Sequence, residues 1–150
     1  MNFKKIYIII FLSFTVQFLS AQDCTDYHEF HCLFGDYTFF YSKQSKSMLM
    51  RPGQKAELKI VAYGGEDYFV SVCATKKFGK LRFKIIEDTP EKNILYDNAE
   101  NNYEESVIFS NETTKNLIIE VSVPEASSDK KAKEYRCVGV VIMFRKTQNK

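Results

Sequence analysis

The sequence has no tryptophan, only two histidines and three prolines, and little glycine. A serine triad needs a histidine oriented by a carboxylate, yet both histidines stand near the N-terminus beside cysteines. No Gly-x-Ser-x-Gly elbow and no glycine-rich phosphate loop is present. The sequence therefore predicts a protein that is not an enzyme and needs no cofactor. Paired carboxylates leave a small hydrolase as an alternative, because their spacing is spatial and not sequential.

An excess of positive charge is also missing. The whole chain has 21 basic and 19 acidic residues, and residues 1–21 contribute two lysines and no acid. Without those residues the count is 19 against 19, so the remaining domain is formally neutral. A protein that neutralises phosphates needs a basic surplus. The charge balance therefore excludes nucleic acid as the expected partner.

One apolar run stands at the N-terminus. Lys4 and Lys5 precede an apolar stretch that extends to Leu19, and Ser20 and Ala21 form a small-residue cleavage site. The stretch is shorter than the roughly 20 apolar residues of a stable membrane span. We therefore expect residues 1–21 to be a cleaved signal peptide, no membrane span to remain, and the mature protein to be secreted or periplasmic.

Four cysteines, an even number in an exported chain, predict two disulfides: Cys24, Cys32, Cys73 and Cys137. Three pairings are open. Cys24 and Cys32 share a short, turn-rich segment, whereas Cys73 and Cys137 lie in apolar alternating runs that neighbouring strands could bring together. We therefore expect the pairs 24–32 and 73–137. The chain divides into the signal peptide (1–21), a disulfide-containing segment (22–36) and one folded domain (37–150).

Alternation with a period of two recurs after residue 50 and predicts strands. The clearest runs are 57–62, 68–73, 81–86, 117–123 and 138–145. The last run is apolar on both faces, as in a central strand. Turn residues such as Pro52-Gly53 and Gly64-Gly65 separate the runs. Strands at intervals of about 8–12 residues predict an all-β, antiparallel β-sandwich with eight or nine strands.

Residues 66–123 resemble the pre-peptidase C-terminal type of secreted β-sandwich. The resemblance is carried by the strand 67–73 after a glycine turn, by 81–88 followed by 94–97, and by the late strand 115–121. It implies a jelly-roll-like sandwich that serves as a binding or accessory module. The family often has acidic residues ahead of its middle strand, where this chain has Lys80, Arg82 and Lys84.

Two clusters have the residue types of metal ligands. Cys24, His28 and Cys32 would share one helix face with His31 beside them, a set suited to zinc, although disulfide formation competes for the thiolates. The second cluster is an acidic loop with oxygen donors for calcium. Its candidate ligands are Asp97, Asn98 and Glu100, with Asp88, Glu104 and Glu105 nearby.

Aromatic side chains are abundant, with 13 Phe and 9 Tyr. Core packing explains most of them, because a sandwich without tryptophan needs other large fillers. The dense run is Tyr37, Phe39, Phe40 and Tyr41, with Tyr27, Phe30 and Phe34 upstream. Part of it could form an exposed platform for a sugar or for a partner protein. Asn111 begins an Asn-Glu-Thr glycosylation sequon, which matters only in a eukaryotic secretory pathway.

The sequence thus favours a non-catalytic secreted or periplasmic binding or accessory module with an unknown protein or glycan ligand. The first alternative is a structural component of a cell-surface assembly that recognises the edges of other proteins by strand addition. The second is the small hydrolase that uses a metal or carboxylates. An aromatic patch, an unprotected edge strand or converging carboxylates would distinguish the three.

Overall fold

The computed structural model describes residues 23–125 and 134–148. The predicted signal peptide lies outside this range. The described chain forms these elements in order: α2 (Tyr27–His31), β1 (Phe40–Tyr41), β2 (Lys46–Met50), β3 (Lys55–Ala62), β4 (Glu66–Ala74), η2 (Lys76–Phe78), β5 (Arg82–Glu87), β6 (Ile94–Asp97), η3 (Asn98–Asn101), β7 (Ser106–Asn111), β8 (Lys115–Ser122) and β9 (Arg136–Lys146). No helix among the described residues is long and apolar enough to cross a membrane.

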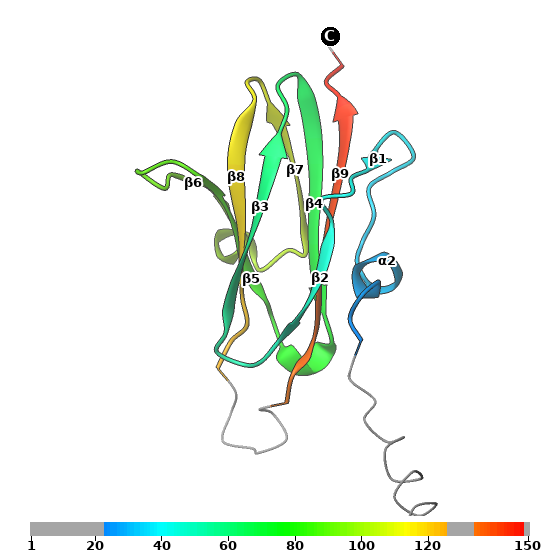
Figure 1. Ribbon diagram of the computed structural model, residues 1–150, viewed down its shortest axis with the longest axis vertical. Coiled ribbons are helices and arrows are strands. Elements are labelled where there is room, and N and C mark those ends of the chain that lie inside the picture. Colours follow the sequence, from blue (N-terminus) through cyan, green and yellow to red (C-terminus); the bar gives the residue numbers. More distant parts are fainter. Residues whose placement is uncertain (1–22, 126–133, 149–150) are drawn as a thin grey trace, which may run out of the picture.

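The strands form two antiparallel sheets that face each other (Figure 1). Sheet A has the order β1-β9-β4-β7, and β2 also pairs with β9, further along that strand. Sheet B has the order β3-β8-β5-β6. The predicted all-β antiparallel sandwich with eight or nine strands is therefore confirmed, and the described residues form nine.

The connections give the sandwich its jelly-roll character. From β2 to β9 the chain crosses from one sheet to the other at every step except β5 to β6, which are hydrogen-bonded neighbours in sheet B. The order β2-β9-β4-β7 facing β3-β8-β5-β6 is that of a double-sheet jelly roll. The last strand, β9, is therefore central, between β4 on one side and β1 and β2 on the other.

Alternation along each strand explains the core. Tyr68, Val70 and Val72 of β4 point into the space between the sheets, where they meet Leu117, Ile119 and Val121 of β8. These side chains are β-branched, aromatic or otherwise bulky, which suits a pleated surface that is buried on one side. Turns close the strands where the backbone takes positive φ, as at Gly53 and Gly65.

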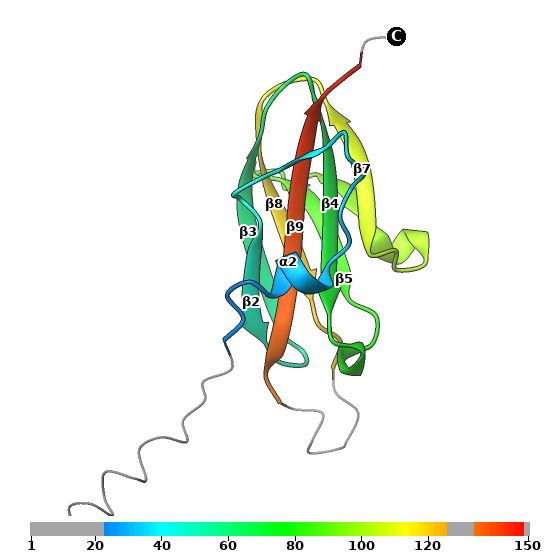
Figure 2. The same ribbon diagram turned by 90° about the vertical axis from the view of Figure 1, so that its right-hand side faces the viewer.

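β4 and β9 are apolar on both faces, because their outer face is covered as well. Phe69, Val141 and Met143 form a second, smaller buried cluster with Phe39, on the side of sheet A away from sheet B. The N-terminal segment, residues 24–45, lies over this cluster, and α2 contacts β9, β2 and β4 (Figures 1 and 2). Part of the molecule thus has three layers, the N-terminal segment being the third.

Candidate functional site

Both disulfides attach the N-terminal segment to the outer face of sheet A. Cys24 is bonded to Cys137 of β9, and Cys32 is bonded to Cys73 of β4. The predicted pairs 24–32 and 73–137 are therefore wrong. The register explains why: Cys73 of β4 lies opposite Gly139 of β9, two residues from Cys137. Such a diagonal offset is about 7–8 Å, which exceeds the Cα separation of ordinary disulfides.

The close approach of α2 to β9 depends on Gly139. A Cβ atom built on this residue would lie 2.7 Å from the Cys32 sulfur and 2.7 Å from the Cα of His28. Neither atom has room to move, since one belongs to a disulfide and the other to the helix backbone. Glycine in the interior of a strand often marks such a backbone approach. This signal was present in the sequence and was missed.

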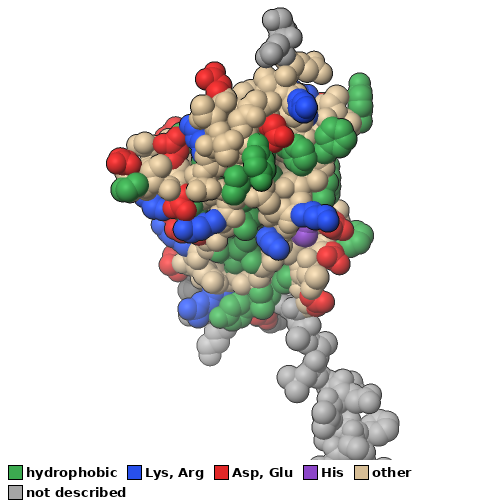
Figure 3. All heavy atoms as spheres, turned by 45° about the horizontal axis from the view of Figure 1, so that its top comes forward, with side chains coloured by type: hydrophobic (Ala, Val, Ile, Leu, Met, Phe, Trp, Pro, Cys, Tyr) green, Lys and Arg blue, Asp and Glu red, His purple; other side chains and the backbone are tan. Residues whose placement is uncertain are grey.

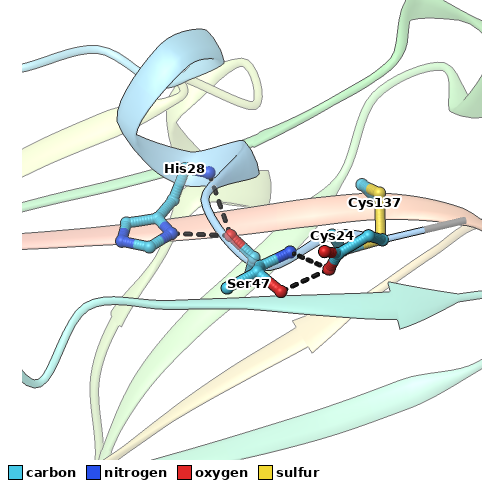
Figure 4. The surroundings of a disulfide bond; sticks show 6 residues. Cys24, His28, Ser47 and Cys137 are labelled. Carbon is cyan, nitrogen blue, oxygen red and sulfur yellow. Dashed lines mark hydrogen bonds between the residues drawn. A yellow bond between two sulfur atoms is a disulfide. The ribbon is translucent and has the colours of Figure 1, made fainter.

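His28 fastens α2 to the strands beside it. Its side chain is buried, with Nδ1 2.6 Å from the Ser47 hydroxyl and Nε2 2.6 Å from the Tyr41 hydroxyl. Its backbone N–H also donates to the Ser47 hydroxyl at 2.9 Å (Figure 4). His31, by contrast, is exposed and stacks on Tyr27. Because Cys24 and Cys32 are in separate disulfides, the zinc hypothesis is left without its thiolate ligands.

The inner side of the N-terminal segment is apolar, and so is much of its outer side. Phe39 is only 6% exposed, whereas Tyr37 is 97% exposed two residues earlier. We define the aromatic face as the exposed apolar side chains on the outer side of this segment: Phe30, Leu33, Phe34, Tyr37 and Tyr41. Phe34 stacks on Tyr41. Phe40 is also exposed, but it alternates with Tyr41 and packs against Phe144 on the side of sheet A that faces sheet B, so it is not part of this face. Figure 3 shows hydrophobic side chains on the side of the molecule where β1 and α2 lie.

The turn that presents Tyr37 is held from both sides. The Asp36 carboxylate accepts the backbone N–H of Thr38 at 2.8 Å. The guanidinium of Arg145 lies 4.4 Å from the centre of the Phe39 ring and donates to the Thr38 hydroxyl at 2.8 Å. Arg145 in turn donates to buried Asp67. An exposed aromatic side chain on a fixed backbone loses little conformational freedom on binding, which favours its use as a contact residue.

The predicted calcium ligands have other structural roles. Asp97 forms two hydrogen bonds with Arg82, at 3.1 and 2.5 Å, and these lower the pKa of its carboxyl group. Asn98 is buried, and its amide bonds to the backbone of Phe83, Leu81 and Glu104. Glu100 is exposed on η3. Asp97 and Asn98 therefore connect η3 to β5, and their side chains do not converge with that of Glu100 on a common point.

The remaining calcium candidates are also separate from one another. Asp88 pairs with Lys59 at 2.9 Å and with Lys92 at 2.7 Å, while Glu104 and Glu105 are exposed. Within residues 23–125 and 134–148, no group of three or more His, Cys, Asp or Glu side chains is placed to hold a metal ion. A hollow of about 230 Å³ beside η2 has Glu105 as the one carboxylate among its described lining residues. This hollow therefore has no pair of carboxylates among its described lining residues.

The sequon at Asn111 is not presented for modification. Asn111 is buried at the end of β7, and its side-chain nitrogen donates to the carbonyl oxygens of Ala62, Tyr63 and Thr113, at 2.8 to 3.0 Å. These bonds join the β3–β4 turn to the β7–β8 turn. An attached glycan would use the same nitrogen atom and would break them.

Comparison with known proteins places the chain at the level of fold. No family model matches it, so kinship with pre-peptidase C-terminal domains gains no support, and no curated protein matches it in sequence. A solved structure is similar in shape: PliG of Aeromonas hydrophila, a periplasmic lysozyme inhibitor of g-type lysozyme. The TM-score is 0.51 at 11% sequence identity, over 75% of this chain and 92% of that one. The two proteins share a sandwich fold.

Proposed function

We propose that this chain is a non-catalytic binding protein that acts outside the cytoplasm and contacts a protein partner through its aromatic face. The observation that carries the proposal is the aromatic face itself. Exposed apolar side chains that gather into a patch mark interaction sites on soluble proteins. Tyrosine and other aromatic residues are also enriched in the centres of protein interfaces.

The fixed position of the N-terminal segment also supports this proposal. Two disulfides, the His28 bridge and the Arg145 contacts fix the backbone that carries the aromatic face. A preorganised surface pays less entropy on association than a loose one. The disulfides also favour an oxidising compartment outside the cytoplasm.

A protein partner fits this face better than a glycan. Sugar sites combine a stacked ring with polar groups that bond the hydroxyls. Here most of the exposed side chains are Phe or Leu without polar atoms, and the Tyr41 hydroxyl is already bonded to His28. The fold likeness to a periplasmic lysozyme inhibitor makes a lysozyme the partner class that we propose, with inhibition as the activity.

The test uses the oxidised protein and a purified g-type lysozyme. We expect binding in titration calorimetry and slower lysis of cell-wall suspensions by that lysozyme. Tyr37→Ser and Phe30→Ser should each weaken binding by about tenfold, the effect of an interface hot spot. Tyr63→Ser is the matched control, since Tyr63 is also an exposed tyrosine, at 57%, but lies in the β3–β4 turn.

Two results would contradict the proposal. Absence of both binding and inhibition with the g-type enzyme would exclude the lysozyme as partner. Binding that Tyr63→Ser weakens as much as Tyr37→Ser does would show that the aromatic face is not the contact surface.

A further inference from the structure

The four outer edges of the two sheets are protected to very different degrees. An edge strand presents unpaired main-chain N–H and C=O groups, and natural proteins usually guard such edges with charges, short strands or irregularities. At the β3 edge, both main-chain groups of Val61 are bonded by the side-chain amide of Gln44, at 2.8 and 3.1 Å. By alternation, Lys55, Glu57 and Lys59 share this outward direction. The β3 edge is therefore capped at one end and charged along the rest.

Two other edges are short or irregular. β6 has four residues, its register with β5 shifts at Ile85/Ile86, and it ends on Asp97. On the other side of sheet A, β1 has two residues and β2 has five. None of these strands offers a long regular row of main-chain groups to another chain.

β7 lacks all of these protections. It has six residues, none charged and none proline, and it pairs with β4 without a register shift. The Val72 N–H donates to the Glu105 carbonyl, so alternation turns Val107 and Phe109 toward β4 and the main-chain groups of Ser106, Ile108 and Ser110 outward. No hydrogen bond found among the described residues uses these outward groups. Figure 2 shows β7 as the outermost strand of its sheet.

The sequence of β7 has the symmetry that pairing with itself requires. Around Ile108, which is 55% exposed, it reads Ser, Val, Ile, Phe, Ser. In an antiparallel pair centred on Ile108, the two Ile108 residues face each other and each Val107 faces a Phe109. The serines at 106 and 110 face each other in the same way. An aromatic residue opposite a β-branched one is a favourable cross-strand pair, and a two-fold axis places the same patch on both sides.

We infer that β7 pairs antiparallel with β7 of a second copy of this chain, so that two copies of sheet A become one continuous sheet. The occupant is the same protein because the residue pattern is palindromic about the proposed axis. The inference is independent of the aromatic face, which lies on the N-terminal segment and not on β7. Both surfaces can be used at once.

The strength of this dimer follows from its size and charge. A strand of this length buries less than the roughly 1,200 Å² of a standard interface, so we expect a weak, concentration-dependent dimer. In the same register Glu104 of one copy faces Glu112 of the other, just beyond the ends of β7, and both are exposed. Because salt screens such repulsion, the dimer should become stronger as ionic strength rises.

The experiment is sedimentation velocity on the oxidised protein over a concentration series at low and high salt. We expect a dimer that grows with concentration in the unmodified protein and in Ile94→Lys, and that is lost in Ile108→Lys. The two isoleucines are matched, because Ile94 is 56% exposed at the edge strand β6 of the other sheet. Ile108→Thr keeps a strand-favouring residue and should weaken the dimer without loss of folding.

Amide hydrogen exchange by NMR tests the register. The N–H groups of Ser106, Ile108 and Ser110 should become protected as concentration rises, whereas those of Val107 and Phe109 stay protected throughout by β4. The second pair also reports whether each variant is folded. A protein that stays monomeric at its highest soluble concentration in high salt would overturn the inference. So would a dimer that persists in Ile108→Lys or that protects other amides.

Discussion

The sandwich and the N-terminal segment are stabilised in different ways. The sandwich is stabilised by a large buried core and by long antiparallel hydrogen-bond ladders between its strands. The N-terminal segment has one short helix, a few buried apolar side chains and two covalent bonds to the sheet. The difference indicates that the segment is held in place by cross-links and specific contacts, while the sandwich is held by burial. The aromatic face therefore depends on the weaker of the two regions.

The largest effect is expected from removing both disulfides, which should distinguish the stability of the N-terminal segment from that of the sandwich. The bonds join residues 113 and 41 positions apart, and chain entropy assigns them about 5 and 4 kcal/mol. In a variant with all four cysteines replaced by serine or alanine, we expect the midpoint of urea unfolding to fall sharply. The segment 24–45 should become accessible to proteases, whereas the amides of β4 and β9 stay protected in water. Loss of sandwich and segment in one step would show that they are not separable.

Gly139→Ala should disturb the contact between α2 and β9 while leaving both disulfides in the sequence. The added Cβ would overlap the Cys32 sulfur and the backbone of α2. Overpacking of this kind costs about 1–3 kcal/mol. We expect the loss to appear in urea unfolding, together with weaker protection of the α2 amides. Val138→Ala, at the neighbouring buried position facing the core between the sheets, is the control. It should lower stability without exposing α2.

Acid should weaken the sandwich at Asp97. The hydrogen bonds from Arg82 lower the pKa of Asp97, so its ionised form stabilises the folded state. That contribution is complete above the pKa of the unfolded chain, near 3.9, and disappears as pH falls through the lower folded value. Asp97→Asn should cost about 1–2 kcal/mol at neutral pH and should make unfolding less sensitive to pH in the acid range. Equal pH dependence in variant and parent would contradict the assignment.

The smallest effect on stability is expected from a substitution at Ser71 of β4, which lies between sheet A and the N-terminal segment. Its side chain is fully buried under the N-terminal segment, and its hydroxyl has no hydrogen-bond partner among the described residues. Because a buried unpaired hydroxyl is costly, Ser71→Ala should be neutral or stabilising by up to about 1 kcal/mol. A clear loss of stability in thermal unfolding would indicate that this hydroxyl does have a partner.

Much of the fold was predictable because period-two patterns report burial directly. The alternation in 68–73 separated Tyr68, Val70 and Val72 from Phe69, Ser71 and Cys73, and the structure buries the first set between the sheets. The two-faced apolar run near the C-terminus correctly indicated a central strand, β9. The disulfide pairing failed because strand register is set by long-range contacts that no local pattern records.

The candidate sites were less accessible to sequence reasoning. The aromatic run 37–41 was visible, but nothing in it separates buried Phe39 from exposed Tyr37, since that depends on which side of the segment meets the sheet. The acidic loop had the donors of a calcium site, yet Arg82 and the backbone of β5 occupy Asp97 and Asn98. Edges are also invisible in a sequence. β3 and β7 both alternate, and only the sheet order reveals that each lies at an edge.

The nested order of the cysteines has a consequence for how the molecule matures. Cys24, Cys32, Cys73 and Cys137 are joined first to last and second to third. A chain oxidised from its N-terminus onward would form the short 24–32 bond first, because close thiols meet most often. That bond is not native and must be broken by thiol–disulfide exchange before the final strand is locked in place. Maturation should therefore depend on a catalyst of disulfide rearrangement, and an oxidant without one should accumulate a trapped, wrongly bonded species.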